Sequence, residues 1–255
     1  MQVTNTSLES LEKQYQKFSG EIEKTGVAII PSVFSTSDIE RARNQVLQNI
    51  DLMKNTRPST SSRHLAGFHR YPRLESLHLM MTTDPVIQSH MEMVCGVGVR
   101  TIGLSDITLN RSQQWHKDLL RGQYRTFMSD KTPCATFHGK MFKAIVYLQD
   151  SNSLKIIPGS HKQDISLDND DQAIPEDPRE VQAISATAGD VVVIDICTTH
   201  RGTTEAAYQS EKTLAPPRIL ISTVFGAMNC EFTDNMETGN TARLRDWMAR
   251  QYTFK

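Results

Sequence analysis

Several apolar, β-branched runs, separated by turn-rich segments, occupy the chain from about Arg100 onward. The clearest are AIVYL, VVVIDI and RILISTVF. Short runs of this kind between turn residues are typical of buried β-strands. We therefore expect a β-rich body whose strands lie at 100–109, 142–149, 154–157, 190–196 and 218–225.

The first third of the chain has helical patterns instead. Apolar residues from Leu8 to Ile22 recur at helical spacing up to Gly26, and a short strand is expected at 27–30. The segment Ser37-Asp38-Ile39-Glu40 has the form of a capping box that opens a second helix. A third helix should begin after Asp84, with Pro85 in its first turn and Gly96 past its end.

These patterns predict a single domain over residues 1–255. Residues 1–99 would form mainly helical support, 100–226 the β body, and 227–255 a C-terminal helix placed around Arg243 to Arg250. The polar, Ser-rich segment 55–66 is expected to be a mobile loop.

Composition narrows the possible partners. The formal net charge is −1, so we expect no nucleic acid or anionic membrane surface as a partner. No apolar run approaches the ~20 residues of a membrane span, and the N-terminal residues do not resemble a secretory signal. The four cysteines are scattered without a CxxC pair, which favours reduced thiols in a cytoplasmic protein.

Two short motifs supply a candidate metal site. His116 and Asp118 lie in WHKD, and His200 lies in CTTHRG just after an apolar run. Two imidazoles and one carboxylate are the ligands that hold non-haem Fe(II) on one face and leave the other open. In a strand, residues 116 and 118 would point to the same side and Lys117 away from it. Taken alone, each histidine is also compatible with an incidental position in a loop or strand end.

A second set of residues is suited to binding a carboxylate. Arg218 begins an apolar strand, and Ser222 would share its face of that strand. Arginine binds carboxylates through two parallel hydrogen bonds. Arg201, beside His200, is the competing candidate and is otherwise expected to contact the substrate. Lys143 would join the set if its face of strand 142–149 looks inward. Each of these cations is also compatible with an ordinary surface role.

Other residues have two open interpretations. Tyr124, Arg125 and His138 lie between the HxD motif and the next strand, where they would line a substrate mouth or simply be solvated. Trp115 is expected in the core or at the rim, and His161 in a structural hydrogen bond. The acidic segment 164–180 would be a lid or a solvated loop.

Whole segments resemble the phytanoyl-CoA dioxygenase family of Fe(II)/2-oxoglutarate oxygenases. GVAIIPSVFSTSDIERAR, LESLHLMMTTDPVIQSHMEMVCG and GDVVVIDICTTHRG are similar to its N-terminal elements and its distal-histidine strand. FKAIVYLQDSNSLKIIPGSHK, with its Pro-Gly-Ser-His turn, is the most specific stretch. The resemblance implies a double-stranded β-helix, that is, a cupin-like jelly roll, with supporting helices.

The resemblance also implies a reaction. His116, Asp118 and His200 would hold iron, while Arg218, with Ser222, would bind the 2-oxoglutarate carboxylate. With O₂, such an enzyme oxidises an unactivated C–H bond and releases succinate and CO₂. The retained Asp118 favours hydroxylation, desaturation or rearrangement over halogenation.

A small-molecule substrate of secondary metabolism and a monomer or homodimer are expected. Three alternatives stay open: a fatty acyl-CoA hydroxylase of the same family, a cupin-like metalloenzyme that does not use 2-oxoglutarate, and a non-catalytic binding protein. The acyl-CoA alternative is disfavoured because the sequence has no clustered basic patch for the phosphates of CoA.

Overall fold

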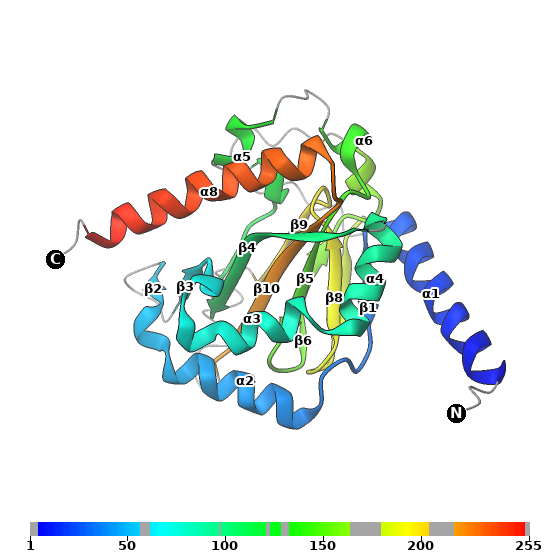
Figure 1. Cartoon of the computed structure of the whole chain (residues 1–255), viewed down its shortest axis with the longest axis horizontal. Helices are drawn as coiled ribbons and strands as arrows, with labels where there is room; N and C mark the ends of the chain where they lie inside the picture. Colours follow the sequence, from blue (N-terminus) through cyan, green and yellow to red (C-terminus); the bar gives the residue numbers. More distant parts are fainter. Residues whose placement is uncertain are drawn as a thin grey trace.

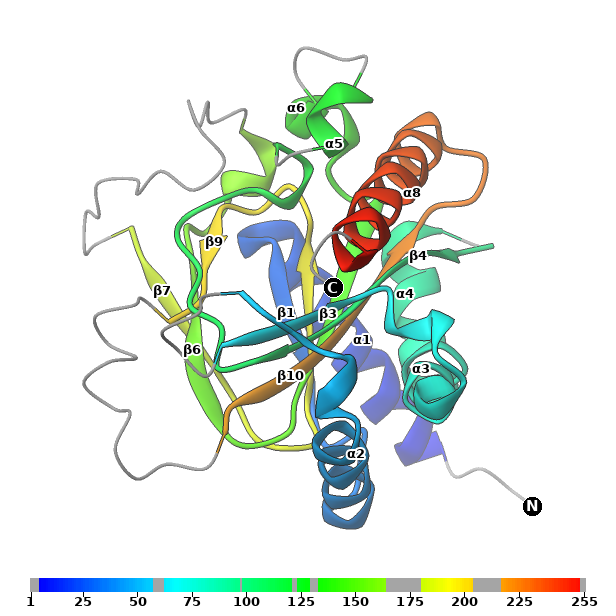
Figure 2. The same ribbon diagram turned by 90° about the vertical axis from the view of Figure 1, so that its left-hand side faces the viewer.

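Two antiparallel β-sheets face each other and form the body of the protein (Figures 1 and 2). The computed structural model describes residues 5–56, 62–96, 98–120, 123–128, 133–163, 180–203 and 217–252. The larger sheet has the strand order β1-β8-β5-β10-β4-β3-β2, and the smaller sheet has the order β7-β6-β9. The strands are β1 (Val27–Ile30), β2 (Lys54–Asn55), β3 (Arg63–Ala66), β4 (Arg100–Leu109), β5 (Met141–Tyr147), β6 (Ser151–Ile156), β7 (Gln182–Ala186), β8 (Val191–Asp195), β9 (His200–Arg201) and β10 (Ile219–Gly226).

Helices cover the outer face of the larger sheet, opposite the smaller sheet (Figure 2). They are α1 (Asn5–Thr25), α2 (Thr36–Gln48), α3 (Glu75–Thr82) and α4 (Pro85–Cys95). A long helix, α8 (Glu231–Tyr252), crosses one end of the sheets beside α5 (Gln123–Thr126), and α6 (Pro133–Phe137) lies at the same end (Figure 1). Short 3₁₀ turns lie at Ile50–Leu52, Phe68–Arg70, Pro72–Leu74, Asp118–Leu120 and Ser160–Lys162.

Successive side chains on the central strands point alternately into two different environments. Phe142, Ala144 and Val146 of β5 pack into the core beneath the helices. Lys143 and Tyr147 of the same strand point the other way, into the space between the two sheets. The alternation follows from the two-residue repeat of a strand. The larger sheet therefore presents an apolar outer face and a partly polar inner face.

Local capping explains two helix starts. The Asp84 carboxylate accepts hydrogen bonds from the backbone N–H groups of Val86 and Ile87, as expected for the N-cap of α4. The capping box of α2 is formed by Ser35 and Asp38, so the helix starts earlier than the predicted Ser37. Ser35 precedes Asp38 by the three residues that the box requires.

Two further predictions gave the wrong limits for a loop and for a helix. Part of the predicted loop 55–66 is strand β3, which pairs with β4 through Leu65 opposite Ile107. The C-terminal helix begins at Glu231 rather than near Arg243. Buried Phe232 and Met236 attach its first turns to the body.

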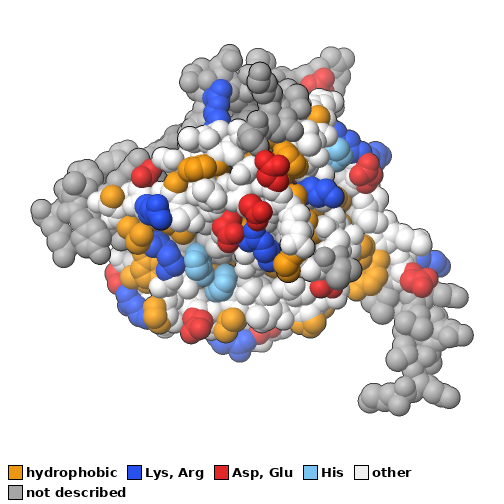
Figure 3. All heavy atoms as spheres, turned by 45° about the horizontal axis from the view of Figure 1, so that its top comes forward, with side chains coloured by type: hydrophobic (Ala, Val, Ile, Leu, Met, Phe, Trp, Pro, Cys, Tyr) orange, Lys and Arg blue, Asp and Glu red, His pale blue; other side chains and the backbone are white. Residues whose placement is uncertain are grey.

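The predicted strands all appear, with ends shifted by up to three residues. Within the described ranges, no helix is both long and apolar enough to cross a membrane. On the face shown in Figure 3, basic and acidic side chains are interspersed.

Candidate metal and cosubstrate site

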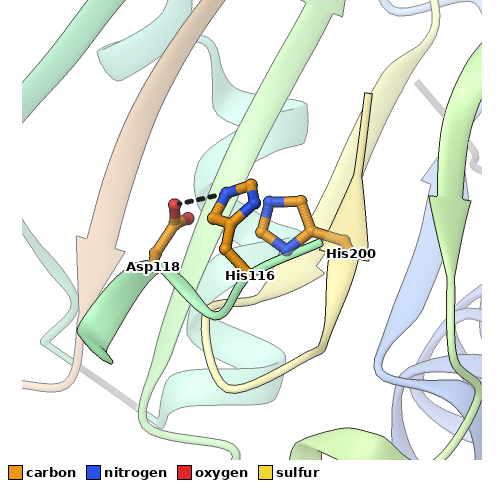
Figure 4. Close-up of side chains that lie close together, drawn as sticks. All are labelled: His116, Asp118 and His200. Carbon is orange, nitrogen blue, oxygen red and sulfur yellow. Dashed lines mark ion pairs between the residues drawn. The ribbon is translucent and has the colours of Figure 1, made fainter. Parts of the chain in front are cut away.

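Backbone hydrogen bonds place the two candidate histidine ligands directly opposite each other. His116 and His200 form an isolated antiparallel bridge, in which each N–H donates to the other residue's carbonyl at 2.9 and 3.0 Å. Asp118 lies at the start of a 3₁₀ turn, so the HxD motif is not on a regular strand as predicted. The turn nevertheless brings its carboxylate to the imidazoles (Figure 4). One potential ligand atom from each residue lies within 4.8 Å of the other two.

The tautomer of each histidine is set by a backbone carbonyl. Nδ1 of His116 lies 2.7 Å from the Gln114 oxygen, and Nδ1 of His200 lies 2.9 Å from the Thr198 oxygen. An imidazole that donates its Nδ1–H to a carbonyl leaves the Nε2 lone pair available to a metal. The Gln113 side chain donates to Nε2 of His116 at 2.9 Å, which agrees with an acceptor at that atom. Two neutral imidazoles and a carboxylate fit Fe(II).

The carboxylate of the site is kept ionised by a neighbouring cation. Lys143 Nζ lies 2.6 Å from Oδ2 of Asp118. Burial acts to raise the pKa of Asp118, but the adjacent Lys143 ammonium outweighs it. The pKa therefore lies well below its ordinary value, and Asp118 is a charged candidate ligand at neutral pH.

The remaining predicted cosubstrate residues line the same cavity, which has a volume of about 400 Å³. Arg218 and Ser222 both project from the inner face of β10 or its approach, as the two-residue repeat requires. The Arg218 guanidinium donates to the Thr203 hydroxyl, a residue that the sequence did not single out. The cavity thus brings together Asp118, His200, Lys143, Arg218 and Ser222.

The four predicted substrate residues have different positions. Tyr124 is buried and lines the cavity, where its hydroxyl donates to the Asn240 side chain at 3.3 Å. Arg125 is exposed on α5. His138 lies beside His161, with ring centroids 6.0 Å apart, and Arg201 lies over the Trp115 ring at 5.2 Å. The last three do not line the described cavity.

Trp115 and His161 are both buried, at 2% exposure each. The expected core position of Trp115 is therefore confirmed. The expected structural hydrogen bond of His161 is not found, since neither ring nitrogen has a partner among the described residues. The acidic segment 164–180 lies outside the described residues except for Glu180.

Sequence reasoning missed a second polar cluster on the cavity wall. Asp106 of β4 accepts two hydrogen bonds from Arg243 of α8, at 2.8 and 2.9 Å, and one from His64 of β3 at 3.1 Å. Arg243 and Asp106 are 137 residues apart, so no local pattern connects them. The alternation of Asp106 and Thr108 with apolar residues in β4 was the one available signal of an inward polar face.

Known structures share this architecture. The non-heme alpha ketoglutarate dependent epimerase SnoN from nogalamycin biosynthesis is 16% identical, with 85% of this chain and 84% of that chain covered and a TM-score of 0.61. HygX from Streptomyces hygroscopicus, solved with nickel, 2-oxoglutarate and hygromycin B, is 18% identical, with 84% and 88% covered and a TM-score of 0.58. The carbocyclase SnoK is 19% identical, with 86% and 85% covered and a TM-score of 0.60. These similarities confirm the predicted jelly roll with its helical N-terminal region.

Sequence comparison identifies the family. Curated protein sequences give no significant match. The model of the phytanoyl-CoA dioxygenase (PhyH) family matches residues 22–208, which include His116, Asp118 and His200 but end before Arg218. Since this match spans more than half of the chain, the protein belongs to the phytanoyl-CoA dioxygenase family, as the resemblance predicted.

Proposed function

We propose that this protein is an Fe(II)- and 2-oxoglutarate-dependent oxygenase that oxidises a C–H bond of a small-molecule secondary metabolite. The observation that carries the proposal is the cluster of His116, Asp118 and His200 beside a cavity that also holds Lys143 and Arg218. Family membership supports the same class of reaction. Hydroxylation, desaturation and rearrangement are all within this class.

The chain's own residues would hold the metal and keep it reactive. His116 and His200 would each bind through Nε2, because their Nδ1 atoms are engaged by carbonyls, and Asp118 would supply one negative charge. Bound Fe(II), with 2-oxoglutarate and O₂, supplies the oxidant and yields succinate and CO₂. The protein contributes orientation and exclusion of water, for which the buried, apolar Ile145 on the cavity wall is suited.

Two cations in the cavity are assigned to 2-oxoglutarate. Arg218, steadied by Thr203 and helped by Ser222, would bind the distal carboxylate. Lys143 is already in contact with a carboxylate, that of Asp118, and faces the same cavity. It would shift part of its hydrogen bonding to the bound cosubstrate.

The proposal also includes the class of substrate and the cellular location of the enzyme. SnoN has been solved with nogalamycin RO and HygX with hygromycin B, which supports a small molecule of secondary metabolism here. All four cysteines are free, which suits a cytoplasmic enzyme. We also propose that residues 1–255 form a single domain and that the protein is a monomer or homodimer. We propose no nucleic-acid or membrane partner.

The first experiment is an anaerobic titration of Fe(II)-loaded protein with 2-oxoglutarate, read by the weak visible metal-to-ligand charge-transfer band. The wild type should develop the band. Arg218→Ala should require about 10- to 100-fold more 2-oxoglutarate, because it loses a charge-assisted bidentate contact. Arg245→Ala, which changes an exposed arginine of α8, is the matched control and should titrate like the wild type.

Other outcomes would select the alternatives. A protein that binds Fe(II) but shows no band would favour a cupin-like metalloenzyme without 2-oxoglutarate. Absence of Fe(II) binding would favour a non-catalytic protein. Once the band is established, succinate release provides the readout for a substrate screen, in which acyl-CoA compounds test the fatty acyl-CoA alternative.

A further inference from the structure

The cavity has a second polar wall on β3, β4 and α8 that the metal and cosubstrate do not need. Its members are His64, Asp106, Arg243 and Trp247, all of which line the cavity. The iron ligands and Lys143 belong to other elements, the HxD turn, β9 and β5. Asp118 and Asp106 both act electrostatically to raise the pKa of Arg243. The wall is therefore close enough to the candidate metal site for Arg243 to interact with the Asp118 carboxylate.

Asp106 fixes the orientation of both neighbours. Its Oδ2 contacts Nε2 of His64 at 3.1 Å and Nη1 of Arg243 at 2.8 Å, while Oδ1 contacts Nη2 of Arg243 at 2.9 Å and accepts from the backbone N–H of Gly67 at 3.3 Å. Because His64 and Arg243 share one carboxylate oxygen, they lie side by side on the wall. The Trp247 ring packs edge-on against His64, with centroids 5.0 Å apart.

This arrangement leaves a defined set of hydrogen-bonding positions. His64 donates from Nε2 to the ionised Asp106, so its Nδ1 is an acceptor, and Nδ1 has no partner among the described residues. Arg243 has five N–H groups, of which one goes to Asn240, two go to Asp106 and another is engaged by the Tyr124 hydroxyl. An acceptor on His64 and a remaining N–H donor on Arg243 therefore lie next to each other.

Together His64, Asp106 and Arg243 carry no net charge, although Lys54 lies 4.6 Å from the centroid of the Trp247 ring and Arg111 acts electrostatically on His64. Burial acts to raise the pKa of Asp106, but Arg243 and His64 hold it well below its usual value, so its negative charge offsets that of Arg243. Burial lowers the pKa of His64 to about 4, so the imidazole is neutral at physiological pH. A donor and an acceptor that lie side by side in a group without net charge match hydroxyl groups, each of which both donates and accepts. A fatty acyl chain would leave these polar atoms desolvated, and an anion would meet the His64 acceptor unfavourably.

We propose that His64 and Arg243, held by Asp106, bind neighbouring hydroxyl groups of the substrate, which is therefore a neutral, polyhydroxylated ring such as a sugar or cyclitol unit. This inference rests on the proposed function, since it assigns a substrate class to the same cavity. His64 accepts from one hydroxyl, and Arg243 donates to the oxygen of the next. Hydroxyl recognition of this kind would place one C–H bond of the ring towards the metal.

The test uses protein loaded with Zn(II) and 2-oxoglutarate, which cannot turn over. The probes are myo-inositol and methyl α-D-glucopyranoside, with cyclohexanol, octanoate and inorganic phosphate for comparison, and binding is measured by calorimetry. The two polyols should bind more tightly than the other three compounds. His64→Leu and Arg243→Lys should each weaken polyol binding about 10-fold, the loss of one hydrogen bond, while the exposed-residue control Arg245→Ala leaves it unchanged.

A measurement on the wild type covers the case in which a variant does not fold. In a ¹⁵N-histidine NMR titration, myo-inositol should shift the Nδ1 resonance of His64 as it accepts a hydrogen bond. Tighter binding of octanoate or phosphate than of the polyols, or no shift at His64 Nδ1, would overturn the inference. Failure of the charge-transfer band with polyol binding intact would instead refute only the proposed cosubstrate.

Discussion

The ammonium group of Lys117 lies 2.6 Å from the backbone carbonyl oxygen of Ser160, and it also donates to the carbonyl of Cys197. Lys117 is completely buried, and in sequence it lies between the candidate metal ligands His116 and Asp118. It therefore ties the HxD turn to the Pro-Gly-Ser-His turn and to the segment that leads into His200. The sequence predicted that this side chain points away from the metal, and the structure shows that it points into the scaffold of the site.

Lys117→Met should loosen this scaffold. Methionine fills a similar volume but removes the ammonium donor from two carbonyl groups. Among the described residues, Ser160 then keeps only the backbone N–H of Gln163, and Cys197 only the weak thiol donor of Cys134, so we expect a total cost of roughly 1–3 kcal/mol. We expect a lower free energy of unfolding in urea and faster loss of bound Fe(II) to a chelator. Lys140→Met, which changes an exposed lysine, is the control and should behave like the wild type in both measurements. Unchanged chelator kinetics in Lys117→Met would show that the tether does not position the ligands.

His116→Ala and His200→Ala should each abolish Fe(II) binding and turnover, because each variant removes one of three ligands. Metal content after reconstitution and succinate release measure the two effects. His78→Ala removes a histidine of α3 that does not line the cavity, and it should retain both properties. Turnover that survives in His116→Ala would contradict the ligand assignment.

The buried His161 predicts a stability that depends on pH. Burial and the nearby Lys162 lower its pKa to about 4, whereas in the unfolded chain it titrates near the ordinary histidine value of 6.5. The unfolded state therefore takes up the proton first as pH falls, so the stabilisation is present above about pH 6.5 and is lost towards about pH 4. When the pH falls from about 7 to about 5, His161 should therefore lower the free energy of unfolding by roughly 1–2 kcal/mol.

His161→Leu isolates that contribution from the other histidines. Metal-free wild type and variant should be compared by urea unfolding at both pH values. The variant should lose less stability on acidification than the wild type does. Equal losses in the two proteins would show that His161 does not titrate on unfolding.

How far the sequence predicted the structure depends on whether the signal is local. Asp84 and Pro85 mark the start of α4 correctly, because a cap acts within one turn. The early part of α8 was missed, since Thr238, Gly239 and Asn240 are weak helix formers and burial of Phe232 and Met236 decides its conformation.

The same distinction applies to the site. The clustering of His116, Asp118 and His200 could be predicted from residue type and flanking motifs, although not from the conformation of the HxD segment. The Asp106–Arg243 pair joins a strand to a helix far away in sequence, so only the folded structure reveals it.

A final prediction concerns the backbone next to the metal site. Gly26 joins α1 to β1 with φ +84°, and a Cβ atom there would lie 2.3 Å from Oγ1 of Thr198 and 2.8 Å from Nδ1 of His161. Thr198 also supplies the carbonyl that orients His200. Gly26→Ala should therefore destabilise the fold by about 2–4 kcal/mol, from positive φ and overpacking together, and should weaken Fe(II) binding.

Gly20→Ala is the matched control, because Gly20 lies within α1 and a Cβ atom there meets nothing within 4 Å. This variant should be as stable as the wild type or up to about 1 kcal/mol more stable, since alanine is the better helix former. Thermal unfolding and Fe(II) titration of the two variants provide the comparison. If Gly26→Ala matched Gly20→Ala in both measurements, the close approach of Gly26 to Thr198 would not constrain the segment that carries His200.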